Sequence, residues 1–100
     1  MDLIILYNDI GEIEENSIKF YQVSETYTCS VGRSRINVPY TLPSGSTVLG
    51  CFVERSPNPN WVFGYVYNDS LSSSGYIHFD YFNSYSSEVS GNLVIGILYK

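Results

Sequence analysis

The segment WVFGYVY at residues 61–67 decides the fold of this chain, because aromatic and β-branched residues fill it and a loop with two prolines precedes it. Such residues favour a β-strand, and no segment repeats apolar residues at the 3.6-residue period of a helix. Similar short segments, each bounded by Gly, Pro, Asn, Asp or Ser, occur along the chain. We expect eight strands, over 3–7, 17–23, 26–31, 35–40, 47–53, 61–67, 76–82 and 93–99. The expected fold class is all-β, an antiparallel, jelly-roll-like β-sandwich that forms one domain over residues 1–100.

The alternation of side chains assigns places to several of these strands. Residues 47–53 are apolar on both faces, which predicts a central strand, and residues 93–99 are expected to close the sheet. Pro39 cannot donate a ladder hydrogen bond, so the strand at 35–40 should lie at an edge or end there. The same alternation assigns four aromatic side chains to the core: Phe20, Phe52, Phe63 and Phe79.

The first residues carry an unusual apolar run. Residues 3–7 (LIILY) are all apolar, so at a period of two residues both faces of a strand would be apolar. A partner chain that covers one face would explain this pattern, and we expect a homo-oligomer. Residues 1–16 are then a linker or an oligomerisation strand. The alternative is a terminal strand buried within the domain's own sandwich.

The charge of the chain is acidic, with 5 basic and 10 acidic residues and a net charge of −5. Nucleic-acid binding requires a basic face, and the basic residues are scattered along the sequence, so we expect no nucleic-acid partner. Membrane insertion is not expected either, because no apolar run approaches the length of a span. A signal peptide is not expected, because Asp2 follows Met1 and the apolar run ends at Tyr7.

The residues that carry chemistry are few. Cys29 and Cys51 lie in expected strands and should be reduced, buried thiols, with a cross-strand disulfide as the alternative. His78, the one histidine, shares a strand face with Asp80, but nothing in the sequence brings a nucleophile to this pair. The sequence has no phosphate loop, dinucleotide fingerprint or cluster of metal ligands. We therefore expect a non-enzymatic protein without a cofactor.

Two short resemblances lead to minor alternatives. NDSLSS at 68–73 resembles the calcium-binding loop of βγ-crystallin domains, which implies Asn68, Asp69, Ser72 and Ser73 as ligands. The hairpins that such loops need fit poorly at 7–11 and 82–91, so we expect no metal. Separately, residues 35–38, 43–50 and 75–82 resemble strands of bacterial Src-homology-3-like wall-binding domains, with no counterpart for the N-terminal third or for the residues after 82.

A broader resemblance covers residues 36–100. The order of motifs there resembles the C-terminal domains of bacteriophage tail fibres and receptor-binding proteins. Its motifs are INVPY at 36–40, LPSG at 42–45, VLG at 48–50, YFN at 81–83, SG at 90–91 and LVIGILYK at 93–100. The resemblance implies a β-sandwich head, commonly a trimer, that adheres to a bacterial surface glycan or protein. It also implies a place in the virion, on a tail or fibre made in the host cytoplasm.

The aromatic content suggests how such a head would bind. The chain has ten tyrosines and one tryptophan, and exposed aromatic rings stack on sugars while their polar ends form hydrogen bonds. The loop residues Asn58, Asn60, Trp61 and Tyr85 are our expected ligand-binding residues. The alternative for Trp61 is a role in capping the core. The alternative function is a small acidic phage-encoded inhibitor or interaction protein that acts on a host protein complex.

The apolar N-terminal run predicts self-association. Light scattering at micromolar concentration should give a multiple of 11.3 kDa, with a trimer expected. Substitution of Ile4 and Leu6 by Ser should weaken the assembly, because it removes one apolar face of the run. A monomeric protein that keeps its solubility after this double substitution would contradict the prediction.

Overall fold

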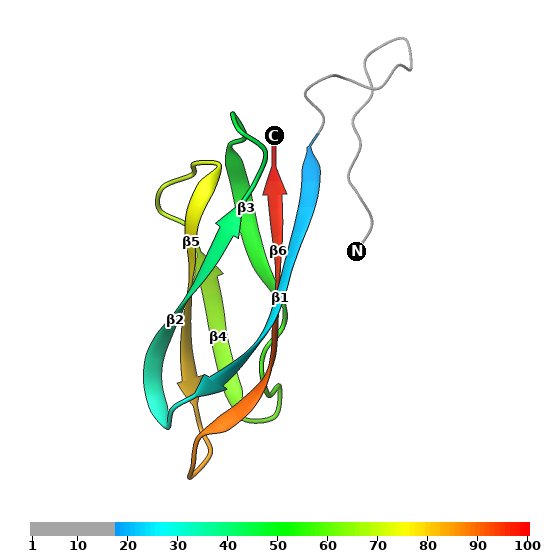
Figure 1. The fold of residues 1–100 in the computed structure, drawn as a ribbon. Helices are drawn as coiled ribbons and strands as arrows, with labels where there is room; N and C mark the ends of the chain where they lie inside the picture. The colour runs from blue at the N-terminus through cyan, green and yellow to red at the C-terminus, as the bar shows by residue number, and fades with distance from the viewer. Residues whose placement is uncertain (1–17) are drawn as a thin grey trace.

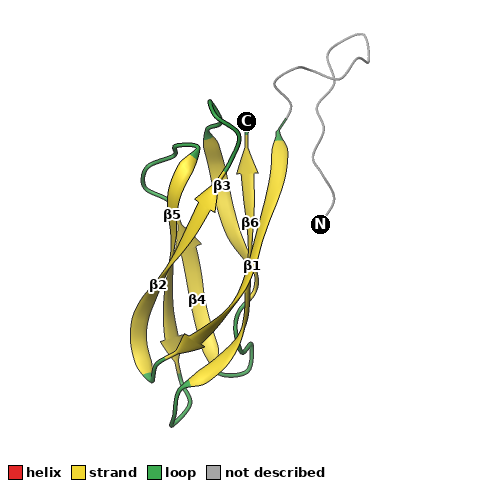
Figure 2. Ribbon diagram, in the orientation of Figure 1, coloured by secondary structure: helices red, strands yellow, loops and turns green. Residues whose placement is uncertain are grey.

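The computed structural model describes residues 18–100, and these contain six β-strands and no helix (Figures 1 and 2). They form two antiparallel sheets of three strands, with the orders β1-β6-β3 and β2-β5-β4. The prediction of an all-β fold is confirmed. The strands are β1 (Lys19–Cys29), β2 (Gly32–Thr41), β3 (Val48–Arg55), β4 (Val62–Tyr67), β5 (Ser74–Asn83) and β6 (Val89–Tyr99). Within residues 18–100 there is accordingly no helix that could span a membrane.

The predicted number of eight strands is wrong for the part of the chain that the structure describes. The run at 3–7 lies outside the described residues, as does the proposed linker at 1–16. The segments 17–23 and 26–31 form one strand, β1, because Ser24-Glu25 continues the ladder with β6 instead of turning. Neither residue is a Gly or Pro that would end the strand, and Ser24 Oγ accepts a hydrogen bond from Asn92 Nδ2 at 3.0 Å.

The order of strands also corrects two predictions. β6 is the central strand of its sheet, whereas β3, which we expected at the centre, lies at an edge. The outward Phe52 of β3 packs against residues of its own sheet. Phe52 stacks with Phe20 of β1 at 6.3 Å between ring centroids, and both rings cover Gly96 of β6 on the outer surface. Phe20 and Phe52 are therefore not core residues. β2, which contains Pro39, is an edge strand as predicted.

The two sheets share one hydrophobic core. β6 contributes Leu93, Ile95 and Ile97, and β5 contributes Ile77, Phe79 and Tyr81, at alternate positions along each strand. These central strands provide most of the core because they have a neighbour on each side. The other buried apolar residues are Cys29, Val38, Tyr40, Leu42, Val48 and Val62.

The inner face of β4 is built from small residues, Val62, Gly64 and Val66. A Cβ atom on Gly64 would overlap the backbone oxygen of Asp80 and lie 2.8 Å from Cε1 of Phe79, so this position has no room for a side chain. The larger side chains of β4 lie at the alternate positions and point outward. Phe63, which we predicted to be in the core, is 55% exposed on the outer face of its sheet. Phe79 alone of the four predicted core phenylalanines is fully buried.

The connections gather at the two ends of the molecule (Figure 1). At one end, the loop before β4 meets the loop after β5, where Ser84 N donates to Trp61 O at 2.9 Å. At the opposite end, the loop between β4 and β5 meets the start of β3, where Val48 N donates to Leu71 O at 3.1 Å. The loops at 58–61 and 68–73 therefore lie at opposite ends.

The two cysteines are free thiols. Cys29 pairs with Val89 and Cys51 with Ile97, so the two are separated by eight residues of β6, or roughly 26 Å along the strand. This separation is far beyond the reach of a disulfide. Cys29 is buried, as predicted, while Cys51 is only half-buried, because β3 is an edge strand.

The contrast between Phe79 and Phe63 predicts that the same substitution has a large effect on stability at residue 79 and a small one at residue 63. Phe79→Ala should lower the free energy of unfolding by about 3–5 kcal/mol, because it opens a cavity between the sheets. Phe63→Ala, the matched control on the neighbouring strand, should change it by less than about 0.5 kcal/mol. Urea denaturation measures both variants, and equal effects would contradict the assignment of the two faces.

Candidate functional site

The outer face of the β2-β5-β4 sheet carries three cross-strand rows of large side chains. Each row takes one residue from each strand in the order β2, β5, β4, as the register of the two strand pairs shows. Residues directly opposite each other on one face are in contact range, so each row is a unit. The rows are Arg33–Phe82–Phe63, Arg35–Asp80–Tyr65 and Asn37–His78–Tyr67.

Aromatic rings dominate this face, which we name the aromatic face and define by Trp61, Phe63, Tyr65, Tyr67, Tyr76 and Phe82. Tyr65 is 62% exposed, and Phe63, Tyr76 and Phe82 are exposed as well. Phe63, Tyr65 and Tyr67 follow one another at alternate positions of β4, a row roughly 13 Å long, and Trp61 lies in the turn just before the strand. Few soluble domains expose so many neighbouring rings without a binding function.

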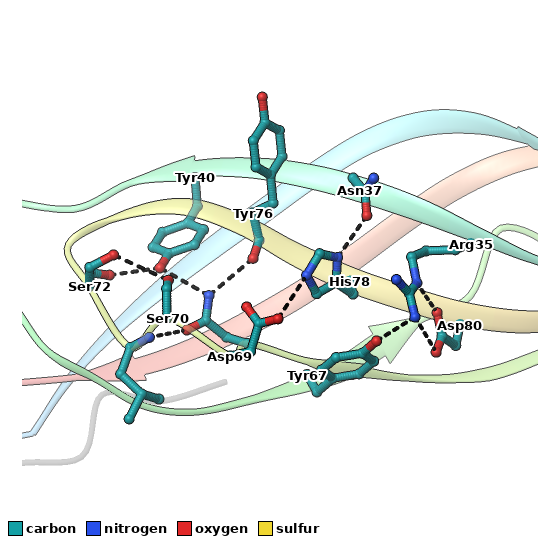
Figure 3. A network of polar contacts seen from close by, with 12 residues as sticks. Arg35, Asn37, Tyr40, Tyr67, Asp69, Ser70, Ser72, Tyr76, His78 and Asp80 are labelled. Carbon is teal, nitrogen blue, oxygen red and sulfur yellow. Dashed lines mark hydrogen bonds and ion pairs between the residues drawn. The ribbon is translucent and has the colours of Figure 1, made fainter.

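An ion pair fixes the middle of the aromatic face (Figure 3). Arg35 Nε donates to Asp80 Oδ1 at 2.6 Å and Arg35 Nη2 to Asp80 Oδ2 at 3.3 Å, in the two-bond geometry that suits a guanidinium and a carboxylate. Arg35 Nη2 also donates to the Tyr67 hydroxyl at 2.6 Å. The hydrogen bond from Arg35 holds the pKa of Asp80 below its usual range, and the same bond raises the pKa of Arg35.

His78 is part of the same polar network. Its Nδ1 lies 2.7 Å from Asn37 Oδ1, its Nε2 lies 3.6 Å from Asp69 Oδ2, and its ring lies 5.1 Å from the Tyr67 ring. His78 and Asp80 share a face, as the alternation predicted, but Asp80 pairs with Arg35 instead. Neither cysteine is a partner of this histidine, since both lie in the other sheet. The network orients side chains and has no nucleophile–base pair among residues 18–100.

A hollow of about 470 Å³ opens on this face beside the ion pair. Arg33, Arg35, Tyr65 and Asp80 line it with outward side chains, and Ser34 and Tyr81 complete it. The Arg33 guanidinium lies 5.6 Å from the centre of the Phe82 ring, a cation–π contact. Among residues 18–100, no carboxylate lies within ion-pair distance of Arg33.

The structure brings together two of the four predicted ligand-binding residues. The rings of Trp61 and Tyr85 lie 4.7 Å apart, and each side chain is 40% exposed. Asn58 builds the turn instead, because its carbonyl accepts hydrogen bonds from Trp61 N and Val62 N and its Oδ1 accepts one from Asn60 N at 3.2 Å. Asn60 is exposed beside it. The Trp61–Tyr85 pair continues the aromatic face at the loop end of β4.

The candidate calcium loop, residues 68–73, lies at the opposite end of the molecule from Trp61. Many of its polar atoms already form hydrogen bonds within the protein. Asn68 Nδ2 donates to the Tyr40 hydroxyl and to Tyr76 O, both at 3.0 Å, and Asn68 Oδ1 accepts from Leu71 N. Leu71 has a φ of 56°, a left-handed conformation that this contact holds in place. Asp69 faces His78, Ser72 Oγ donates to Ser74 O at 2.8 Å, and Ser73 O accepts from Leu42 N. Within residues 18–100, no three His, Cys, Asp or Glu side chains gather as a metal site would require.

Sequence reasoning missed most of the aromatic face. Phe63, Tyr65 and Tyr67 share one side of β4, but the prediction from the sequence assigned Phe63 to the core. The signal that could have corrected this is the Val-Gly-Val inner side of β4, since a glycine there leaves room for a ring from a neighbouring strand. The pairing of Arg33 and Arg35 with β5 had no local signal.

Comparison with known proteins adds no family to this description. No family model, no curated protein and no solved structure matches the chain. The geometry of the described residues therefore carries the functional argument.

The Arg35–Asp80 pair predicts a specific titration. The Asp80 carboxyl should titrate below its usual range, so its bond to Arg35 stabilises the fold above the pKa of an unfolded-chain Asp, about 3.9. This contribution is lost as the pH falls through the lower pKa of Asp80. Carboxyl-carbon NMR should show the midpoint rising toward the usual range in Arg35→Gln. Arg55→Gln, an equal charge change on the other sheet, should leave it in place, and the same midpoint in both variants would contradict the assignment.

Proposed function

We propose that this chain is a non-enzymatic recognition domain that binds a bacterial surface glycan along its aromatic face. The observation that carries the proposal is the row Phe63, Tyr65 and Tyr67 on one side of β4, together with the exposed Trp61 in the turn just before that strand. Rings in such a row stack on the apolar faces of successive sugars, and their hydroxyls bond to sugar hydroxyls. The length of the row suits an extended saccharide rather than a single small molecule.

Polar side chains beside the row support the same ligand class. Tyr67, Asp80 and Arg35 form hydrogen bonds among themselves, yet each retains exposed surface that can meet a hydroxyl group. A sugar needs both stacking and directional polar contacts, and this face offers the two within one sheet. Strand residues also lose little conformational freedom on binding, because the ladder already fixes their backbone.

The chemistry of the titratable groups supports a function without catalysis. Burial raises the pKa of the Cys29 and Cys51 thiols, which disfavours the reactive thiolate form. His78 contacts Asn37 through Nδ1 and lies beside the tilted Tyr67 ring, so its polar contacts serve the surface network. The hollow beside Arg35 is open, without the enclosure from which catalytic sites exclude water.

The wider setting of the domain belongs to the same proposal. The resemblance of residues 36–100 to phage tail-fibre heads implies a place on a virion, as an adhesion domain that is commonly trimeric. We retain an antiparallel sandwich as the architecture of this head, whereas a jelly-roll-like strand order stays a prediction. The trimer also stays a prediction, because the apolar run at 3–7 on which it rests lies outside the described residues.

A glycan array tests the proposal, with the wild-type protein expected to bind saccharides of bacterial surfaces. Tyr65→Ala should weaken the binding by about tenfold or more, as truncation of a central aromatic contact does. Tyr21→Ala is the matched control, because Tyr21 is an exposed tyrosine of β1 in the other sheet. Trp61→Ala should also weaken the binding, with an unchanged melting temperature.

Two results would overturn the proposal. The first is that no saccharide binds while a host protein is captured through the same tyrosine, which would favour the alternative of a small interaction protein. The second is a Trp61→Ala variant that melts at a lower temperature but binds normally below it, together with an inert Tyr65→Ala. That result would make the aromatic face a structural feature.

A further inference from the structure

The hollow between the first two rows of the aromatic face differs in charge from the rest of the chain. The chain carries a net charge of −5, but two of its five basic residues, Arg33 and Arg35, line this one hollow. Asp80 is the single acidic side chain that lines it. The local charge is therefore positive by one unit, from two arginines and one aspartate.

The two arginines differ in their contacts. Arg35 donates hydrogen bonds to both carboxylate oxygens of Asp80 and to the Tyr67 hydroxyl, so its Nε and Nη2 groups already have partners. Arg33 stacks over Phe82, and no described carboxylate neutralises it. A guanidinium stacked on a ring keeps its edge free, and its fork of N–H groups matches a carboxylate or a phosphate.

The hollow adds shape to this charge. Its wall on the far side from Arg33 is Tyr65, the most exposed ring of the aromatic face, so a sugar stacked on Tyr65 would extend toward Arg33. Ser34 and Tyr81 complete the lining of the hollow, which is open to solvent. An anionic group on that sugar would then replace water at the Arg33 guanidinium, which forms no ion pair with a carboxylate of residues 18–100.

We propose that the ligand of this face is an anionic saccharide, with a carboxylate or phosphate group bound in the hollow by Arg33 while its sugar stacks on Tyr65. The inference rests on the proposed glycan-binding function and narrows it to one class of glycan. Arg35 and Asp80 act as positioning residues, since their ion pair holds the wall of the hollow in place.

The test compares matched probes on the full chain. An oligogalacturonate is charged where its methyl ester is neutral, on the same sugar chain, and a phosphorylated mannan supplies phosphate on a sugar ring. Calorimetry and the Nε–Hε signals of the arginines report the binding. We expect the acid, the phosphate polymer or both to bind about tenfold or more tightly than the ester, with a clear shift of the Arg33 signal. This preference should weaken as salt is raised.

Two substitutions at Arg33 and one control complete the test. Arg33→Gln should remove the preference for the charged probe, and Arg33→Lys should retain part of it, because a lysine keeps the charge but not the fork. Arg55→Gln makes the same charge change on β3 of the other sheet and should have no effect. A preference for carboxylate over phosphate, or the reverse, identifies the source of the anion.

The outcomes separate this inference from the function on which it rests. Equal binding of the acid and its ester, lost in Tyr65→Ala but unchanged in Arg33→Gln, would overturn the inference and leave glycan binding standing. Exclusive binding of neutral saccharides on the array would do the same. Absence of any saccharide binding, with no shift on the aromatic face, would overturn both.

Discussion

The close approach of β5 to Gly64 of β4 is the constraint on which the arrangement of the β2-β5-β4 sheet depends. The backbone oxygen of Asp80 and the ring of Phe79 fill the space that a side chain at position 64 would occupy, so this inner position of β4 holds a glycine. The large residues Phe63 and Tyr65 lie at the alternate positions of β4 and are exposed on the outer side, whereas Phe79 is buried between the sheets.

The same contact explains why the polar network lies where it does. With the rings of β4 outside, the outward residues of β5 meet them directly across the sheet, and Asp80 comes to lie between Tyr65 and Arg35. An ion pair at this position stabilises the fold little, because surface pairs are screened by water. Its main effect is geometric, since it fixes the Arg35 guanidinium against the hydroxyl of Tyr67.

The fold class could be read from the sequence because it depends on local periodicity, while the strand order could not. Both 47–53 and 93–99 are apolar on two faces, and nothing local shows that β6 takes the centre and β3 an edge. In that order Phe20 of β1 stacks with Phe52 of β3 over Gly96 of β6, a contact between three strands that no local pattern reveals. Trp61 and Tyr85 could be singled out as loop aromatics, yet their proximity to each other arises from long-range pairing. Arg33 could not be found at all, because its significance comes from Phe82 on another strand.

A binding surface built on strands has a different selectivity from one built on loops. Loops adapt to a ligand and lose conformational freedom when they do so, whereas the rings of the aromatic face are already held at fixed spacing by the ladder. Such a surface favours a ligand whose own units repeat along a line and whose shape is already extended. It discriminates poorly between the units themselves, because stacking is tolerant of ring substituents. Discrimination must then come from a directional group, and a guanidinium with a free edge beside the row, as at Arg33, is the side chain best suited to provide it.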